Sequence, residues 1–137
     1  MNNFQGLYNI RAGKEEDKNF ILATFLRGLY YGDSFFSRIP KDIFMNKYKL
    51  VANALVNDEK TIVRIACLPE DPDVILGYSL ISSDQSTVYF TFVKTAWRKR
   101  GIGKSLVPPS PQYVAHLTKL GESLLDKINN PQFNPFF

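Results

Sequence analysis

The sequence predicts a mixed α/β fold in which one mostly antiparallel sheet is flanked by helices. Two segments within the first 57 residues repeat apolar side chains every three or four positions, as helices do. Three β-branched and aromatic runs follow with short turns between them, as in an antiparallel meander. A chain of 137 residues, 45% of them hydrophobic, is long enough for one core, so residues 1–137 are expected to form a single domain.

The first third of the chain reads as a strand and two helices. A strand is expected at about Leu7–Ala12, because "YNIRAG" alternates and ends at a glycine. Residues 14–31 then predict a helix, since apolar residues recur every four positions and three acids stand at its positive end. After a loop, the spacing of Phe44, Tyr48, Val51 and Leu55 predicts a second helix that begins near Pro40.

The middle third reads as three strands. The runs "TIVRIACL" (61–68), "VILGYSLIS" (74–82) and "STVYFTFV" (86–93) are separated by segments rich in turn-forming residues. Strict alternation in the third run puts one set of side chains on a single face, and that set is Thr87, Tyr89, Thr91 and Val93.

The last third is harder to interpret because prolines interrupt it. "GIGKSLV" begins as a helix, and Pro108, Pro109 and Pro111 prevent it from continuing. "QYVAHL" (112–117) predicts a further strand and residues 117–128 a final helix. The tail "NNPQFNPFF" is expected to be irregular, with its phenylalanines Phe133, Phe136 and Phe137 packed against the domain.

Composition limits the classes of function. No apolar run approaches the roughly 20 residues of a membrane span, and the start lacks the pattern of a secretory signal, so a cytoplasmic protein without membrane contact is expected. Cys67 is the single cysteine, which excludes an internal disulfide and a paired-cysteine metal site. We expect it to be a buried structural thiol, and we expect no metal. The net charge of +4 conceals five cations within residues 94–104.

The stretch "WRKRGIGKSL" (97–106) resembles a phosphate-binding loop without its first glycine. A nucleotide-hydrolysing P-loop needs glycine where Arg98 stands, and a side chain is disfavoured there if the loop requires a positive φ. Gly101 and Gly103 instead lie at a strand-to-helix junction, where free backbone N–H groups form an anion site. The stretch therefore suits a diphosphate held against the backbone, with Arg98 and Arg100 adding charge-assisted bonds.

At these residues the sequence resembles the GCN5-related N-acetyltransferases, which transfer acetyl from acetyl-coenzyme A to an amine. The family signature is Arg or Gln, two free residues, Gly, one free residue, then Gly or Ala, after a strand, and residues 98–103 match it in full. The opening "NIRAGKEEDKNFI" and the run "ILGYSLI" are similar to the first strand, the acidic helix start and the third strand of the family. The resemblance covers about residues 8–107.

The resemblance implies acetyl-coenzyme A as cofactor and a set of residues that bind it. Backbone amides of the loop would hold the pyrophosphate, and Val93 would offer the amide that polarises the thioester carbonyl. Pantetheine would pair with the strand edge around residues 92–94. The implied cofactor-binding residues are Val93, Arg98, Lys99, Arg100, Gly101, Ile102, Gly103, Lys104 and Ser105.

Other residues are candidates for chemistry and acceptor binding. Many family members carry a glutamate on the fourth strand as base, whereas no carboxylate occurs here between Ser86 and Val93. Tyr89 and His116 are the remaining catalytic candidates, each with packing as its alternative role. Tyr30 and Tyr31 are candidates for contact with the amine substrate, with helix-end packing as the alternative.

Two departures keep other functions open. The chain is short after the last helix, so the C-terminal strands of the family are missing here or supplied by a second copy in a homodimer. The leading interpretation is an N-acetyltransferase acting on a primary amine of a small molecule or protein. A binding module that keeps the fold without the reaction is the first alternative, and a nucleic-acid binder using the basic cluster and Trp97 is a less favoured one.

Overall fold

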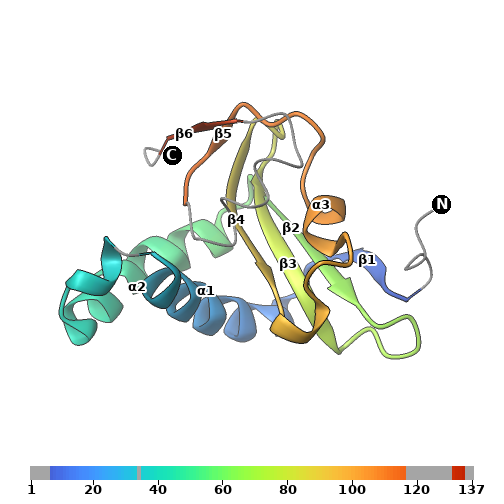
Figure 1. Ribbon diagram of the computed structural model, residues 1–137, viewed down its shortest axis with the longest axis horizontal. Coiled ribbons are helices and arrows are strands. Elements are labelled where there is room, and N and C mark those ends of the chain that lie inside the picture. Colours follow the sequence, from blue (N-terminus) through green and yellow to red (C-terminus); the bar gives the residue numbers. More distant parts are fainter. Residues whose placement is uncertain (1–6, 34, 117–130, 135–137) are drawn as a thin grey trace.

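A computed structural model of the protein describes residues 7–33, 35–116 and 131–134 (Figure 1). The predicted final helix at residues 117–128 lies outside these ranges. The elements in chain order are β1 (Asn9–Ala12), the 3-10 turn η1 (Glu15–Asp17), α1 (Lys18–Gly32), η2 (Phe36–Arg38), α2 (Lys41–Asn57), β2 (Thr61–Cys67), β3 (Ile75–Ser82), β4 (Thr87–Val93), η3 (Thr95–Trp97), α3 (Ile102–Leu106), β5 (Tyr113–Val114) and β6 (Gln132–Phe133).

The six strands form one sheet in the order β1-β2-β3-β4-β5-β6. The pairs β1–β2, β2–β3 and β3–β4 are antiparallel, which confirms the predicted meander, whereas β5 is parallel to both β4 and β6. The mixed, mostly antiparallel sheet confirms the predicted fold class.

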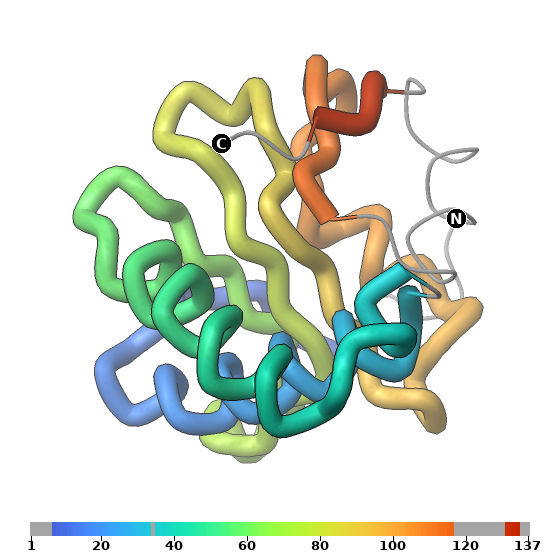
Figure 2. The backbone as a smooth tube through the Cα atoms, turned by 90° about the vertical axis from the view of Figure 1, so that its left-hand side faces the viewer, coloured from blue at the N-terminus to red at the C-terminus, as the bar shows by residue number. Residues whose placement is uncertain are grey.

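Helices cover both faces of the sheet, as Figures 1 and 2 show from two directions. The larger core lies under α1 and α2, where Phe25, Leu29 and Phe44 are buried together with Tyr78 and Phe90 of the sheet. The smaller core lies under α3 on the opposite face. Apolar positions that recur at helical spacing therefore face the sheet, as the sequence predicts.

An ion pair fixes the start of α1. Asp17 is 5% exposed and accepts the Lys14 backbone N–H at 2.7 Å. The guanidinium of Arg11, on β1, donates to both carboxylate oxygens of Asp17, at 2.8 and 3.0 Å. These bonds lower the pKa of Asp17, with the Arg11 hydrogen bond as the largest cause. The predicted acidic helix start thus contains one acid that is structural.

The end of the chain differs from the sequence prediction. Only Tyr113–Val114 of the expected strand at 112–117 pairs as β5, so His116 lies beyond the strand. Residues Gln132–Phe133 of the tail, expected to be irregular, pair in parallel with β5. Phe133 is 55% exposed rather than packed. The differences at β5 and β6 have one cause. A strand of two residues is too short to show a periodic pattern in its sequence, so it forms only through pairing with the neighbouring strand.

Two expectations from composition can be compared with the fold. Cys67 is 2% exposed, which agrees with a buried structural thiol. None of the helices within the described ranges is long and apolar enough to cross a membrane.

Candidate functional site

The glycine stretch forms the turn between β4 and α3. Two residues of this turn are left-handed, Lys99 with φ of 64° and Gly101 with φ of 83°. Helix α3 begins at Ile102, and its first intrahelical bond runs from the Ser105 N–H to the Gly101 carbonyl at 3.0 Å. The N–H groups of residues 102–104 precede that bond and have no partner within the helix. The turn therefore presents backbone donors at the end of β4.

Helix α3 is fixed on the sheet by its apolar side and by its last carbonyl. Ile102 and Leu106 are 1% and 0% exposed and pack with Val93 in the smaller core. The buried hydroxyl of Ser79, at the centre of β3, donates to the Leu106 carbonyl at 2.6 Å. Because its side chain is buried, Ile102 offers only its backbone to an anion. This role of Ser79 was not predicted from the sequence, although a polar residue inside the apolar run "ILGYSLI" indicates a buried hydrogen bond.

The polar side chains of the turn have defined positions. The Nε of Arg98 donates to the Val93 carbonyl at 3.0 Å. The guanidinium of Arg100 lies over the Trp97 ring, 4.9 Å from its centroid. The Ser105 hydroxyl donates to the Gly101 carbonyl at 2.9 Å, so it accepts from the Tyr8 hydroxyl, 2.7 Å away. The predicted loop residues are thus brought together, with Lys99 and Lys104 exposed at its surface.

Part of the edge of β4 beside this turn is not paired by any described strand. The Lys94 N–H donates to the Leu76 carbonyl of β3 at 2.8 Å. Since alternate residues of a strand point to opposite sides, the N–H of Val93 faces away from β3. On that side β5 pairs only with Thr87 and Val88. The backbone around Thr91 and Val93 therefore faces an edge that no described strand covers.

A β-bulge at Tyr89 changes which side chains share a face. Leu80 pairs with Phe90 whereas Ile81 pairs with Val88, so β4 has one extra residue between these pairs. Tyr89 packs against the larger core under α1 and α2, while Val93 belongs to the smaller core. The prediction that Tyr89 and Val93 share a face is wrong, because the extra residue reverses the alternation.

His116 lies in the larger core and is 6% exposed. Its Nδ1 lies 2.6 Å from the backbone carbonyl of Tyr89, and its Nε2 bonds the hydroxyl of Tyr48 on α2. Burial lowers the pKa of His116 and raises the pKa of Tyr48 to about 12. The histidine is therefore neutral near pH 7. Tyr48 was predicted as a helix residue, and nothing in its spacing indicated this contact.

The two tyrosines considered for acceptor binding occupy different environments. Tyr30 is 8% exposed, and its hydroxyl donates to the Ile39 carbonyl at 2.7 Å, so it joins α1 to the segment before α2. Tyr31 is 61% exposed, with the Lys41 ammonium 5.3 Å from its ring centroid. Of the two, only Tyr31 has an exposed side chain.

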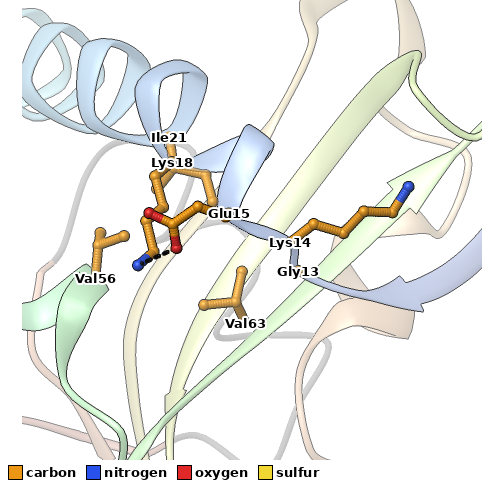
Figure 3. A pocket seen from close by; sticks show the side chains of 7 residues that line it. All are labelled: Gly13, Lys14, Glu15, Lys18, Ile21, Val56 and Val63. Carbon is orange, nitrogen blue, oxygen red and sulfur yellow. Dashed lines mark ion pairs between the residues drawn. The ribbon is translucent and has the colours of Figure 1, made fainter.

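A pocket of about 180 Å³ lies at the start of α1, away from the glycine turn (Figure 3). Its charged residues are partly paired, since Lys18 contacts Glu15 at 2.8 Å and Asn57 at 2.8 Å. The lining residues come from the β1–α1 segment, α2 and β2, and they are Gly13, Lys14, Glu15, Lys18, Ile21, Val56 and Val63. None of them belongs to β4 or α3, so the pocket is separate from the candidate site.

The sequence and the structure were compared with those of known proteins. No family model matches the sequence, and no curated protein sequence matches it significantly. Solved structures do match. A proposed acetyl transferase from Pyrococcus furiosus aligns over 93% of this chain and 80% of its own, with a TM-score of 0.59 and 17% identity.

Two further structures agree with this match. A predicted acetyltransferase from Clostridium acetobutylicum, solved with acetyl-CoA, aligns over 88% of this chain and 87% of its own, with a TM-score of 0.57 and 16% identity. A GCN5-related N-acetyltransferase from Rhodopseudomonas palustris aligns over 72% of this chain and 59% of its own, with a TM-score of 0.50 and 16% identity. The chain therefore has the fold of the GCN5-related N-acetyltransferases.

Proposed function

We propose that this protein is an N-acetyltransferase that transfers acetyl from acetyl-coenzyme A to a primary amine of a small molecule or protein. The observation that carries the proposal is the continuity of the β4 edge with the glycine turn. Backbone groups around Thr91 and Val93 face an edge that no described strand covers, and the strand leads directly to the donors at the start of α3. An extended pantetheine arm pairs with such an edge as a strand would, while its diphosphate meets the turn.

The residues of the turn have separate roles in coenzyme binding. Backbone N–H groups of residues 100–104 bind the diphosphate, and the exposed side chains of Lys99 and Lys104 add positive charge. Gly103 allows the diphosphate to approach the backbone. Arg98 donates a hydrogen bond to the Val93 carbonyl, and Ser105 donates one to the Gly101 carbonyl of the turn. Both residues therefore contribute by holding the binding surface in place.

The chemistry is direct transfer. The amine nitrogen attacks the thioester carbonyl carbon, the new C–N bond forms, and the C–S bond breaks to release the coenzyme thiolate. The Val93 N–H donates to the carbonyl oxygen as negative charge develops on it. The amine loses one proton to water and the thiolate gains one, so no net proton remains on the protein. Tyr31 lies on the surface where the acceptor approaches.

One observation favours the alternative of a coenzyme-binding module without transfer. Residues 86–93 contain no carboxylate, and both ring nitrogens of His116 are hydrogen-bonded in the core. The nucleic-acid alternative loses support, because Arg100 covers the ring of Trp97 that would stack on a base.

Two measurements test the proposal together. Acetyl-coenzyme A at about 100 times its dissociation constant should stabilise the protein by about 2.7 kcal/mol. Release of coenzyme thiol is then followed with and without a panel of primary amines. An unchanged melting temperature at millimolar coenzyme contradicts the proposal. A thermal shift without amine-dependent thiol release selects the binding module instead.

A further inference from the structure

A tyrosine at the start of the chain is tied to the glycine turn. Tyr8 directly precedes β1, and its half-buried ring packs against the smaller core under α3. Its hydroxyl lies 2.7 Å from the Oγ of Ser105 on α3, 97 residues further along the chain. The segment that leads into the first strand therefore contacts the helix that follows the turn.

The two hydroxyl groups form a chain of hydrogen bonds that ends at the Gly101 carbonyl. The Ser105 hydroxyl donates to this carbonyl at 2.9 Å, and the Ser105 N–H donates to it at 3.0 Å. Because a hydroxyl has one proton, the Ser105 Oγ accepts from the Tyr8 hydroxyl. Hydrogen bonds linked in this way strengthen one another. Tyr8 thus directs the Ser105 proton toward Gly101 and away from solvent.

The Gly101 carbonyl belongs to the peptide group that also carries the Ile102 N–H. A peptide group is planar and trans, so its carbonyl and its N–H point in opposite directions. The two bonds from Ser105 direct the carbonyl into α3. The Ile102 N–H is therefore directed out of the helix start, toward the diphosphate of the proposed function. A contact that fixes the Gly101 carbonyl also fixes this donor.

The turn depends on such contacts for its conformation. Lys99 and Gly101 are both left-handed, with φ of 64° and 83°, and the side chain of Lys99 disfavours this conformation. Backbone of this kind persists only where surrounding contacts hold it. Helix α3 has five residues, too few for a helix to be stable by itself. Arg98 fixes the start of the turn and Ser79 the end of α3, whereas the bonds of Ser105 fix the peptide between them.

We infer that Tyr8 is a positioning residue of the glycine turn, which acts through Ser105 to keep the Ile102 N–H directed at the ligand. Without the Tyr8 hydroxyl, the free turn samples other orientations of the Gly101–Ile102 peptide. A ligand then binds only the fraction of molecules that present this N–H, and its affinity falls by that fraction. The inference rests on the proposed function only for the identity of the ligand, the diphosphate of coenzyme A.

Removing the Tyr8 hydroxyl tests this role. Tyr8→Phe keeps the ring and its packing, and we expect coenzyme A to bind about fivefold more weakly by calorimetry. The KM for acetyl-coenzyme A should rise by about the same factor, while kcat stays within about twofold of the parent. Tyr113→Phe, at another half-buried tyrosine, is the matched control on β5 and should bind coenzyme A within about twofold of the parent.

Ser105 supplies a pair of variants that differ in one hydroxyl. Ser105→Thr keeps the group and should bind coenzyme A within about twofold of the parent, whereas Ser105→Val has the same branched shape without it and should bind about fivefold more weakly. Adding Tyr8→Phe to Ser105→Val should weaken binding by less than about twofold more, because the chain of bonds is already broken. Losses that multiply in the double variant, or full affinity in Tyr8→Phe, overturn the inference.

Hydrogen exchange without ligand distinguishes this inference from the proposed function. The Ser105 amide is bonded to the Gly101 carbonyl and should exchange about fivefold faster in Tyr8→Phe. The Gly13 amide, bonded to the Val63 carbonyl at 2.9 Å, reports on the attachment of β1 and should exchange as in the parent. If the parent fails to bind coenzyme A but these exchange rates are found, the positioning role stands and the ligand is wrong. An unchanged Ser105 amide, or an equal acceleration at Gly13, overturns the positioning role.

Discussion

The Nε of Arg98 donates to the backbone carbonyl of Val93 across 3.0 Å, five residues back along the chain. The contact closes the turn at the end of β4 and fixes the peptide that follows Val93, whose N–H, that of Lys94, donates to the Leu76 carbonyl of β3. The arginine of the sequence motif therefore has an internal role in addition to the positive charge it brings to the turn.

Replacing Arg98 should weaken coenzyme binding without abolishing it. Arg98→Ala removes a charged hydrogen-bond donor from the Val93 carbonyl, and such bonds contribute about 1.5–3 kcal/mol. Because this bond exists with and without ligand, we expect a loss of that size in the free energy of unfolding in urea, and the missing positive charge should weaken acetyl-coenzyme A binding measured by calorimetry. Arg27→Ala, which removes an exposed arginine from α1, is the control for net charge and should bind like the parent.

Replacing Gly103 should have a larger effect. A valine side chain at this position would stand where the diphosphate meets the backbone at the start of α3, so Gly103→Val should abolish the thermal shift with acetyl-coenzyme A. Circular dichroism should remain that of the parent, because Gly103 is only half buried. Binding of Gly103→Val with the affinity of the parent would place the anion elsewhere.

The regular elements could be predicted from sequence because burial imposes a period on them. The helix at Lys18–Gly32 follows an apolar spacing of about four residues, and the three strands of the meander are β-branched and aromatic runs between turn-forming segments. The predicted place of Gly101, between a strand and a helix, is also found, and its left-handed backbone is a conformation that glycine adopts without strain.

Single-residue irregularities could not be predicted in this way. The bulge at Tyr89 adds one residue to a strand without any change in composition, and it moves Tyr89 to the other face. Lys99 is left-handed although it has a side chain. The partners of His116 come from segments 27 and 68 residues away, so its environment depends on the tertiary fold.

Removing the hydroxyl of Thr91 should stabilise the protein. Its Oγ1 is buried and has no hydrogen-bond partner among the described residues, and such a group costs about 1–3 kcal/mol. Thr91→Val keeps the shape, so we expect the free energy of unfolding in urea to rise by about 1 kcal/mol. Thr24→Val is the matched control with the opposite sign, because the Thr24 hydroxyl bonds the Phe20 carbonyl and Tyr78. A decrease in Thr91→Val like that of the control would show that the hydroxyl binds water.

The ion pair of Arg11 and Asp17 should make stability depend on pH. The pKa of Asp17 is lowered in the folded state, first by the Arg11 hydrogen bond, so the folded protein binds this proton less readily than the unfolded chain. The stabilisation is complete above the unfolded pKa of about 3.9 and is lost as the pH falls through the lower folded pKa.

Asp17→Asn removes this contribution. Urea unfolding at pH 7 should show a loss of about 3 kcal/mol, as for other buried pairs deprived of one partner. The difference between parent and variant should shrink as the pH falls below about 4. Glu59→Gln, at an exposed site, should follow the parent at every pH. A difference that is constant with pH would mean that Asp17 stabilises the fold by shape alone.

The last prediction concerns the proton that the attacking amine loses. Residues 86–93 contain no carboxylate, both nitrogens of His116 are hydrogen-bonded, and burial raises the pKa of Tyr89, which keeps its hydroxyl protonated. A lysine-like amine with a pKa of about 10.4 is neutral in only about one molecule in 2,500 at pH 7. With no strong base among these residues, the rate should follow this neutral fraction. We expect transfer at saturating acetyl-coenzyme A to rise about tenfold per pH unit between about pH 6.5 and 8.5, without a plateau near 7.

His116→Ala should change the rate by less than about tenfold, below the usual contribution of a general base. A plateau near pH 7 that is lost in His116→Ala would instead make the histidine the base, and it would require Tyr48 to release Nε2 when the substrates bind.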